Sequence, residues 1–303
     1  MGDSRATYNI WAGHLGHLSS SQEDAFAAFK RALVDAKLYD PAQPSAPDDP
    51  NLLRFLRARS WDPAAALKQF SDAEAWRRKN DVDKLFAAFD PTELENSRRY
   101  YPRWTGRRDK NGMPVYVYHL ASMDAAIQKE LSAAPPERRY QRIIALYESM
   151  IRFTMPLCSF VPHPTQTPIT CVVTIIDLKD VSIGSMWNLR SHLSESAKLA
   201  TANYPETLST IAIVNAPPFF PTIWGWIKGW FDQGTRNKIH ILGKNPAETL
   251  LTLLDAENLP RQYGGTLEWE FFSEPDLDAA TKDAIREMPK GPAIFVDGAV
   301  ARP

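Results

Sequence analysis

Residues 169–177 (Ile-Thr-Cys-Val-Val-Thr-Ile-Ile-Asp) form an almost continuous apolar and β-branched run. Such a run is typical of a strand buried on both faces, which occurs where helices cover both sides of a parallel sheet. A similar run at 210–215 follows a predicted helix over about 184–202, and a short strand at 238–242 follows a helical segment over about 217–231. Strands separated by long crossovers predict an α/β fold with a mainly parallel sheet covered by helices.

The N-terminal region has the pattern of a helical unit. Ser20 and Glu23 predict a capping box at the start of the first helix. A short helix is expected over 51–59, and Asp62 followed by Pro63 has the cap and first-position residues of a third helix that continues to about residue 79. Helical patterning thus dominates residues 20–80.

The remaining elements divide the chain into four expected segments. Asn111-Gly112 predicts a turn, 115–118 a strand, 137–153 a helix and 246–254 a short helix. In the C-terminal tail, the apolar stretch 293–296 could dock on the core. The expected segments are an N-terminal arm (1–19), a helical unit (20–95), an α/β domain (96–275) and a C-terminal tail (276–303).

Composition argues against several classes of function. The formal net charge of −1 gives no global electrostatic basis for binding nucleic acid. Cys158 and Cys171 are too few for a disulfide scaffold and are expected to be small buried hydrophobes. The six histidines lack metal-ligand spacing, and we expect no metal. The sequence contains no G-x-S-x-G elbow, phosphate-binding loop or dinucleotide fingerprint.

Three isolated polar residues leave structural and functional interpretations open. Asp177 ends a buried strand, where both catalytic carboxylates and turn residues occur in α/β folds. His192 and His240 are interpreted as structural residues with satisfied hydrogen bonds. No nucleophile arrangement accompanies any of the three, so an enzyme, for which a lipid hydrolase is the natural candidate, is the weaker interpretation.

The segment 216–231 contains six aromatic residues in sixteen positions. Ile223, Ile227, Trp230 and Phe231 share one helical face, whereas Trp224 is expected to point elsewhere. One interpretation is a helix packed on the sheet. The other is a helix between an apolar cavity and a membrane interface, where tryptophan is favoured. Gly225 and Gly229 weaken the helix and would suit a movable element.

Several short motifs occur in an order and spacing that resemble the CRAL-TRIO lipid-binding family, and within it the phosphatidylinositol transfer proteins. The resemblance covers about residues 20–270. The residues that carry it are Leu52–Arg59 with Trp61-Asp62, Tyr100–Pro102, Asp109–Tyr116, Tyr147-Glu148, Thr174–Lys179, Tyr204–Glu206, Ile213–Pro217, Lys238–Gly243, Glu257–Pro260 and Tyr263–Gly265.

This resemblance implies a CRAL-TRIO fold in which a helical N-terminal unit precedes an α/β domain that encloses one lipid. The implied ligands of the phosphatidylinositol headgroup are Arg59, Glu206, Thr235 and Lys238. The implied lipid pocket includes Tyr116, Tyr147, Val172, Thr174 and Ile176. The implied gate helix, 217–231, carries Phe219, Phe220, Ile223, Trp224, Ile227, Trp230 and Phe231.

One position departs from the family pattern. Members that also exchange phosphatidylcholine carry a serine two residues before the threonine matched by Thr174, and this chain has Val172 there. A hydroxyl donor for the choline-lipid phosphate is therefore missing, and weak phosphatidylcholine binding or a different second ligand is expected. Ser60, where a basic residue often follows the arginine, is a smaller departure.

These observations favour a phospholipid-exchange protein that binds phosphatidylinositol and contacts membranes transiently. The alternatives are a carrier of another hydrophobe, such as a sterol, a terpenoid or another phospholipid, and a regulator that presents its lipid to a lipid kinase. The N-terminus has no apolar signal-peptide core and no long apolar run is present, so a cytoplasmic, monomeric protein peripheral to membranes is expected. The only expected bound small molecule is the phospholipid.

Overall fold

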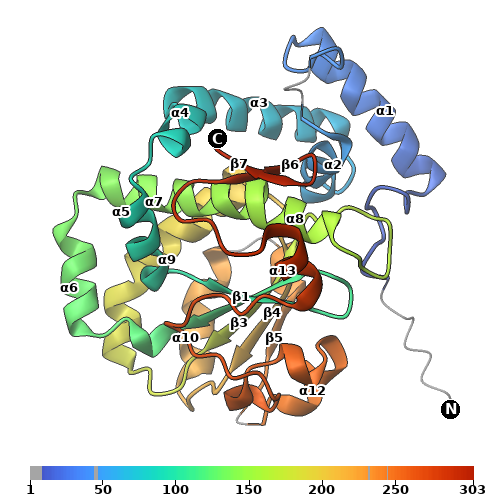
Figure 1. Ribbon diagram of the computed structural model, residues 1–303. Coiled ribbons are helices and arrows are strands. Elements are labelled where there is room, and N and C mark those ends of the chain that lie inside the picture. Colours follow the sequence, from blue (N-terminus) through green and yellow to red (C-terminus); the bar gives the residue numbers. More distant parts are fainter. Residues whose placement is uncertain (1–8, 44–46, 231–232, 244) are drawn as a thin grey trace, which may run out of the picture.

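The structure is a computed structural model that describes residues 9–43, 47–230, 233–243 and 245–303. Its centre is a five-stranded sheet in the order β1-β2-β3-β4-β5 (Figure 1). β1 pairs antiparallel with β2 and the other neighbours are parallel, which confirms the predicted mainly parallel sheet. The strands are β1 Arg103–Arg108, β2 Pro114–His119, β3 Val172–Asp177, β4 Leu208–Val214 and β5 Ile239–Ile241.

Helices surround this sheet and precede it. The N-terminal helices are α1 Ser20–Asp35, α2 Asp49–Ala58, α3 Pro63–Lys79, α4 Val82–Ala87 and α5 Pro91–Ser97. The central ones are α6 Ala125–Ala133, α7 Pro136–Ser149, α8 Met155–Phe160 and α9 Ile183–Asn203. The C-terminal ones are α10 Phe220–Ile227, α11 Gln233–Asn237, α12 Ala247–Leu253 and α13 Ala279–Ile285. A two-stranded hairpin, β6 Ile294–Val296 and β7 Ala299–Ala301, ends the fold.

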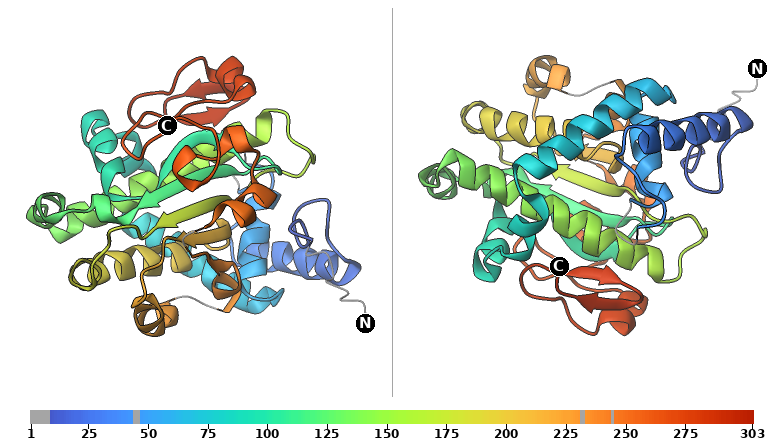
Figure 2. Two further views of the ribbon diagram at one scale, coloured as in Figure 1. Left: turned by 90° about the horizontal axis from the view of Figure 1, so that it is seen from below. Right: turned by 90° about the horizontal axis from the view of Figure 1, so that it is seen from above.

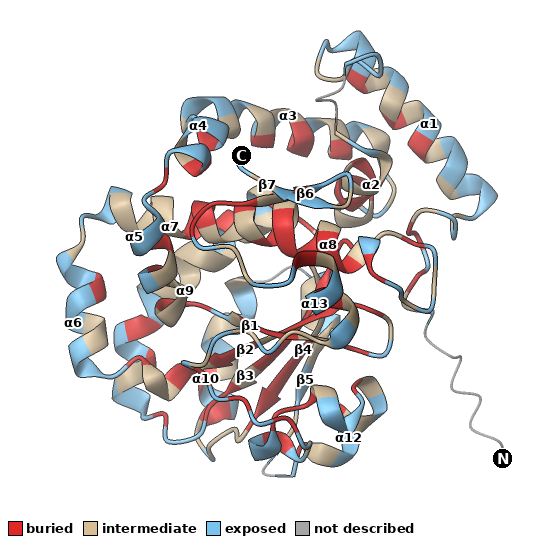
Figure 3. Ribbon diagram, viewed as in Figure 1, coloured by how far each residue is buried: buried red, intermediate tan, exposed pale blue. Residues whose placement is uncertain are grey.

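The two faces of the sheet have different environments. Because side chains alternate along a strand, Thr174 and Ile176 face one side while Val173 and Ile175 face the other. α9 and α10 cover the first side, and the C-terminal segment from α12 onward covers the second (Figure 2). Burial is densest along the strands (Figure 3), and Val173 and Ile175 are almost fully buried. The side of the sheet covered by the C-terminal segment is therefore densely packed, and the cavity described below lies on the α9–α10 side.

The N-terminal unit begins one residue earlier than predicted. Ser19, not Ser20, caps α1, and it forms the capping box with Gln22 rather than Glu23. The pairs Ser19–Gln22 and Ser20–Glu23 have the same three-residue spacing, so the sequence pattern alone did not determine which serine caps the helix. The Asp62 cap of α3 is confirmed, since its carboxylate accepts from the backbone N–H groups that follow it.

Buried polar links fix the N-terminal helices against α7. Arg77 of α3 donates to both carboxylate oxygens of the fully buried Glu148, at 2.8 and 3.2 Å. Tyr204, which follows α9, donates to the same carboxylate at 2.7 Å. Three helices therefore meet at one satisfied charge, which sets the position of the α7 and α9 walls.

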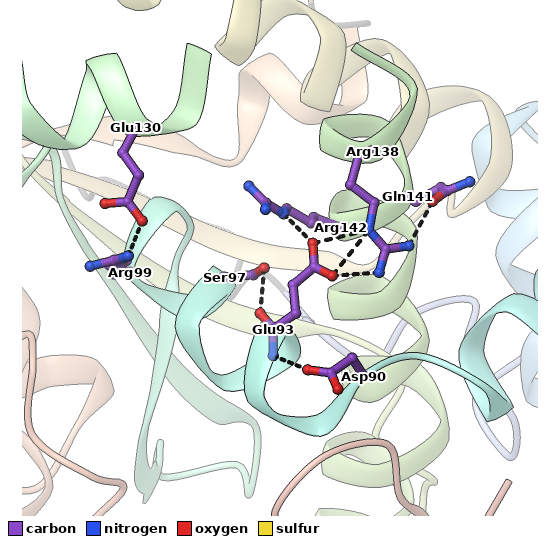
Figure 4. Close-up of polar contacts among 8 residues, drawn as sticks. All are labelled: Asp90, Glu93, Ser97, Arg99, Glu130, Arg138, Gln141 and Arg142. Atoms are coloured by element: carbon purple, nitrogen blue, oxygen red, sulfur yellow. Dashed lines mark hydrogen bonds and ion pairs between the residues drawn. The ribbon is translucent and has the colours of Figure 1, made fainter. Parts of the chain in front are cut away.

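A second polar cluster attaches α5 to α7 (Figure 4). Glu93 accepts from Arg138 and from Arg142, which lie one turn apart on α7. The backbone N–H of Glu93 is capped by Asp90 at 2.7 Å. The bidentate geometry of arginine and carboxylate makes this an orientation-specific contact.

The C-terminal tail packs on the domain. The backbone of Asp276 follows β1 so closely that a Cβ on Gly106, whose φ is +89°, would lie 2.4 Å from it. Asp278 caps α13 and pairs with Arg108 at 2.7 Å. Phe295 is buried in the cluster behind the sheet, which confirms that the stretch at 293–296 docks on the core.

Among the described residues, the continuous helical segment Pro136–Phe160 has the length and hydropathy of a membrane-spanning helix. More than half of its apolar window is buried inside the fold, and a π-helical turn at Met150–Thr154 interrupts it. The segment packs as a wall of the domain, in the manner of a core helix.

Candidate functional site

A cavity of about 290 Å³, called the central cavity below, lies between the sheet and helices α7, α9 and α10. Its lining is predominantly apolar and includes all five predicted pocket residues: Tyr116, Tyr147, Val172, Thr174 and Ile176. Burial raises the pKa of Tyr147 to about 12, so its hydroxyl stays neutral. The ring of Tyr147 stacks on Tyr204, with centroids 4.8 Å apart.

One face of the α10 region closes the central cavity. Phe220, Trp224, Ile227 and Trp230 line it, at a spacing that brings them to the same side of a helix. The expectation that Trp224 points away from this face is therefore wrong. The face that lines the cavity contains Phe220 and Trp224, one turn apart, and not Ile223.

The other predicted gate residues have different surroundings. Ile223 is buried in the main core and Phe219 is half-buried against it. Phe231 lies outside the described residues. The described part of the predicted gate is helical from Phe220 to Ile227 and continues as a 3₁₀ turn to Trp230.

Charged and hydroxyl groups meet at one end of the central cavity. Arg59, Glu206, Thr235 and Lys238 all line it, although they come from three separate segments. Lys238 Nζ donates to Glu206 Oε2 at 2.8 Å, and both side chains are largely buried. The backbone N–H of Lys238 donates to the carbonyl of Thr235 at 3.1 Å, which fixes their relative position. Contacts thus link Glu206, Lys238 and Thr235, whereas Arg59 lines the same cavity and donates to the carbonyl of Ala58 at 2.9 Å.

Glu206 has a strained backbone. Its φ of +57° lies in the left-handed region, which non-glycine residues adopt at a cost of about 1–3 kcal/mol. The preceding turn is held by Thr207, whose hydroxyl donates to the carbonyl of Tyr204 at 3.1 Å. The surrounding structure therefore imposes the conformation that points the carboxylate toward Lys238.

Arg57 is a further charged residue at the charged end of the cavity, and it was not among the ligands expected from the sequence. Its Nε lies 4.0 Å from Glu206 Oε2 and its Nη1 donates to the carbonyl of Gly13 at 3.2 Å. The signal was present in the Leu52–Arg59 run, since positions 54, 57 and 59 are all arginine, but helix phase is needed to tell them apart.

The isolated polar residues have the following environments. Asp177 accepts from Lys179 N, Asn215 Nδ2 and Tyr263 Oη, which are the contacts of a turn residue. His192 is only partly satisfied, since it has a hydrogen bond with the backbone of Tyr100 but its buried Nδ1 has no partner, and burial lowers its pKa to about 4. His240 is exposed.

Both cysteines are buried and free, as predicted. Within the described part of the chain, no group of three or more histidine, cysteine or acidic side chains has the arrangement of a metal site.

The fold and the cavity define a class of protein in which a helical N-terminal unit precedes an α/β domain that encloses an apolar cavity with one charged end. Comparison with known families gives the same assignment. Residues 98–265 match the CRAL/TRIO domain, and residues 17–72 match the CRAL/TRIO N-terminal domain. The chain belongs to the CRAL/TRIO family.

Relatives with curated descriptions extend along most of the chain. The Sec14 cytosolic factor of Schizosaccharomyces pombe is 34% identical over 260 residues, which cover 86% of this chain and 87% of that protein. The phosphatidylinositol/phosphatidylcholine transfer protein SFH7 of Arabidopsis thaliana is 34% identical and covers 78% of this chain, but the match spans only 42% of SFH7. The crystal structure of Sfh5 superposes with a TM-score of 0.61 at 17% identity, over 86% of this chain and 93% of Sfh5, and supports the fold alone.

Proposed function

We propose that this protein binds one phospholipid in the central cavity, with phosphatidylinositol as the preferred ligand, and exchanges it between membranes. The observation that carries the proposal is the division of the cavity into a long apolar lining and one end with Arg59, Glu206, Thr235 and Lys238. The names of the relatives, Sec14 cytosolic factor and phosphatidylinositol/phosphatidylcholine transfer protein, support the same function and a cytosolic location.

The charged end has the chemistry that an inositol phospholipid requires. A phosphodiester is best bound by cationic donors, which Lys238 and Arg59 supply. The hydroxyl of Thr235 can donate a neutral hydrogen bond, and the inositol hydroxyls can donate to the Glu206 carboxylate. The Lys238–Glu206 ion pair, at 2.8 Å, fixes the positions of both side chains. A bound headgroup would interact with both charges.

The acyl chains provide the larger free-energy term. Exposing some thirty methylenes to water would cost on the order of 25 kcal/mol, so a lipid leaves a bilayer slowly by itself. An apolar cavity beside the membrane lowers that kinetic barrier if its wall opens at the surface. In this proposal the α10 region is that wall, and it moves outward because a cavity of about 290 Å³ is at the low end for ligand sites and a two-chain lipid needs more space.

Removing the lysine of the charged end tests the headgroup assignment. Lys238→Ala should reduce phosphatidylinositol uptake from vesicles by about 10–100-fold, the effect of losing one charged hydrogen bond of about 1.5–3 kcal/mol. Lys68→Ala is the matched control, since Lys68 is exposed on α3 and pairs with Asp72 on the same helix. The measurement is transfer of labelled lipid between vesicles, with circular dichroism to verify the fold.

If Lys238→Ala takes up phosphatidylinositol as well as wild type does, the headgroup assignment is wrong. Lys238→Met, which keeps the apolar stem, repeats the test in case the alanine variant is poorly folded.

A further inference from the structure

A second cleft, separate from the central cavity, lies between α2, α8 and the turn of the β6–β7 hairpin. Its volume is about 410 Å³, and no residue lines both hollows. The hairpin contacts α8 (Figure 1), and residues of α2 line the same cleft, although these elements are far apart in sequence. The lining includes Asp48, Asn51, Arg54, Ser159, Thr170 and Asp297. We call it the Arg54 cleft.

Arg54 is unusual among the charged residues of this protein. Only 4% of the surface of Arg54 is exposed, and its Nε is buried without a hydrogen-bond partner. Within the described part of the chain, its side chain makes no hydrogen bond or ion pair. Burial, and then the charge of Arg57, lower its pKa to about 10, so it remains a cation at neutral pH. Buried charges are normally paired, because an unpaired one has lost its hydration without compensation.

The anionic and polar groups near Arg54 are engaged elsewhere. The carboxylate of Asp48 caps α2, where it accepts from the backbone and side-chain nitrogens of Asn51. Glu148 is occupied by Arg77 and Tyr204. Asp297, on the exposed hairpin turn, also lines the cleft but makes no ion pair with Arg54. Among the described residues, no carboxylate is hydrogen-bonded to this guanidinium, although the charges of Asp48 and Glu148 partly offset its burial.

The donors around the cleft match a tetrahedral oxyanion. Arg57, one helical turn from Arg54, lies with its Nη2 3.5 Å from Thr170 Oγ1, and Thr170 lines the cleft. Arg57 itself does not line the cleft, so the cleft presents one cation, Arg54, together with the Thr170 hydroxyl, and the several acceptor oxygens of a phosphate fit the arginine fork. Ser159 contributes less, since its hydroxyl already bonds Met155 and Ile169.

We propose that the Arg54 cleft is a phosphate-binding site, distinct from the lipid headgroup end, in which Arg54 binds inorganic phosphate or a phosphomonoester. The π-helical turn at Met150–Thr154 adjoins the cleft through Ile151 and Met155, and such turns occur frequently at functional sites. Because Tyr147 and Met150 of the same helical segment line the central cavity, occupancy of the cleft would act on a wall of that cavity.

The test is thermal unfolding of the full chain in phosphate and in chloride of equal ionic strength. A ligand that binds only the folded state raises the midpoint, and phosphate at several times its dissociation constant should add about 2–4 °C to wild type. Arg54→Met should lose this rise and Arg54→Lys should retain part of it. Lys238→Ala should keep the full rise, which separates the cleft from the headgroup end.

A second readout distinguishes ligand binding from a purely structural role. Arg54→Met removes an unpaired buried charge, so in chloride it should unfold at or above the wild-type midpoint. A large loss of stability in chloride would mean that Arg54 serves the fold, and an equal phosphate response in wild type and Arg54→Met would place phosphate elsewhere. Either result overturns the proposal.

Sedimentation with phosphatidylcholine vesicles that contain phosphatidic acid identifies the source of the phosphate. Binding that falls only in Arg54→Met supports a lipid phosphomonoester. Unchanged sedimentation, together with the lost midpoint shift, supports a soluble phosphate. If sedimentation is unchanged and the Arg54→Met midpoint still responds to phosphate, the cleft has no such role.

Discussion

At the scale of single residues, the central cavity offers few free donors on its strand wall. The hydroxyl of Tyr116 donates to Thr154 Oγ1 at 3.3 Å and that of Tyr118 donates to the carbonyl of Tyr100 at 3.0 Å. Val172, which lies on the same face as Thr174, contributes no polar atom. A phosphate in this region would therefore find fewer partners than one at the Lys238 end, and under the proposed function we expect this difference to set the headgroup preference of the cavity.

Restoring a hydroxyl should widen that selectivity. Val172→Ser should raise phosphatidylcholine uptake by about fivefold, the effect of one hydrogen bond of about 1 kcal/mol, while wild type takes up little. Val173→Ser is the control, because the side chain of Val173 lies on the opposite face of the sheet and does not line the central cavity. Competitive uptake from mixed vesicles measures the ratio. Robust phosphatidylcholine uptake by wild type would show that Val172 is not a selectivity determinant.

The buried His14 should make the free energy of unfolding depend on pH in the acidic range. Burial, reinforced by Arg57, lowers its pKa from 6.5 to about 3, so the folded protein holds it neutral while the unfolded chain protonates it below about pH 6.5. The unfolded state therefore binds more protons between pH 6.5 and 3, and stability falls as pH falls through this window, by at most about 1.4 kcal/mol per pH unit.

The variant His14→Gln should lose less unfolding free energy than wild type between pH 7 and 5, as measured by urea titration. His240→Gln, at an exposed position, should behave as wild type. Parallel curves for wild type and His14→Gln would mean that His14 does not contribute to the pH dependence.

At the scale of elements, α9 and α10 cover the cavity on the side that opens in the proposed function, and the sheet forms the opposite wall. Trp187 of α9 and Trp226 of α10 are both more than half exposed and contact each other edge to face, with centroids 6.0 Å apart. Lys228 follows Trp226 on the surface. Exposed tryptophan beside a basic residue suits a membrane interface, so this contact lies where the proposed opening begins.

The glycines of the α10 region provide a test of the opening step. Gly225 has no neighbouring atom within 4 Å of an added Cβ, so Gly225→Ala fits and stabilises the helix by about 1 kcal/mol. Vesicle-to-vesicle exchange should slow by about fivefold while equilibrium lipid retention is unchanged. Gly184→Ala, an unhindered helical position in α9, is the control. Unchanged exchange in Gly225→Ala would argue against α10 as the moving element.

At the scale of the whole molecule, the strands buried on both faces were predictable because their apolar runs have no competing pattern. β1 was not predicted, since its charged sequence Arg-Trp-Thr-Gly-Arg-Arg lacks alternation and the strand depends on its antiparallel partner β2. The charged end of the cavity was predictable only through family motifs, because three distant segments supply it. The Arg54 cleft left no motif, since it requires the C-terminal hairpin to pack beside α2.

Mass spectrometry of the lipids retained by the purified protein, after incubation with mixed liposomes, tests the central claim most directly. We expect about one phosphatidylinositol per protein in wild type, and its loss in Lys238→Ala. A protein that retains no lipid, or only lipids without inositol, would contradict the assignment of Arg59, Glu206, Thr235 and Lys238 as the headgroup site.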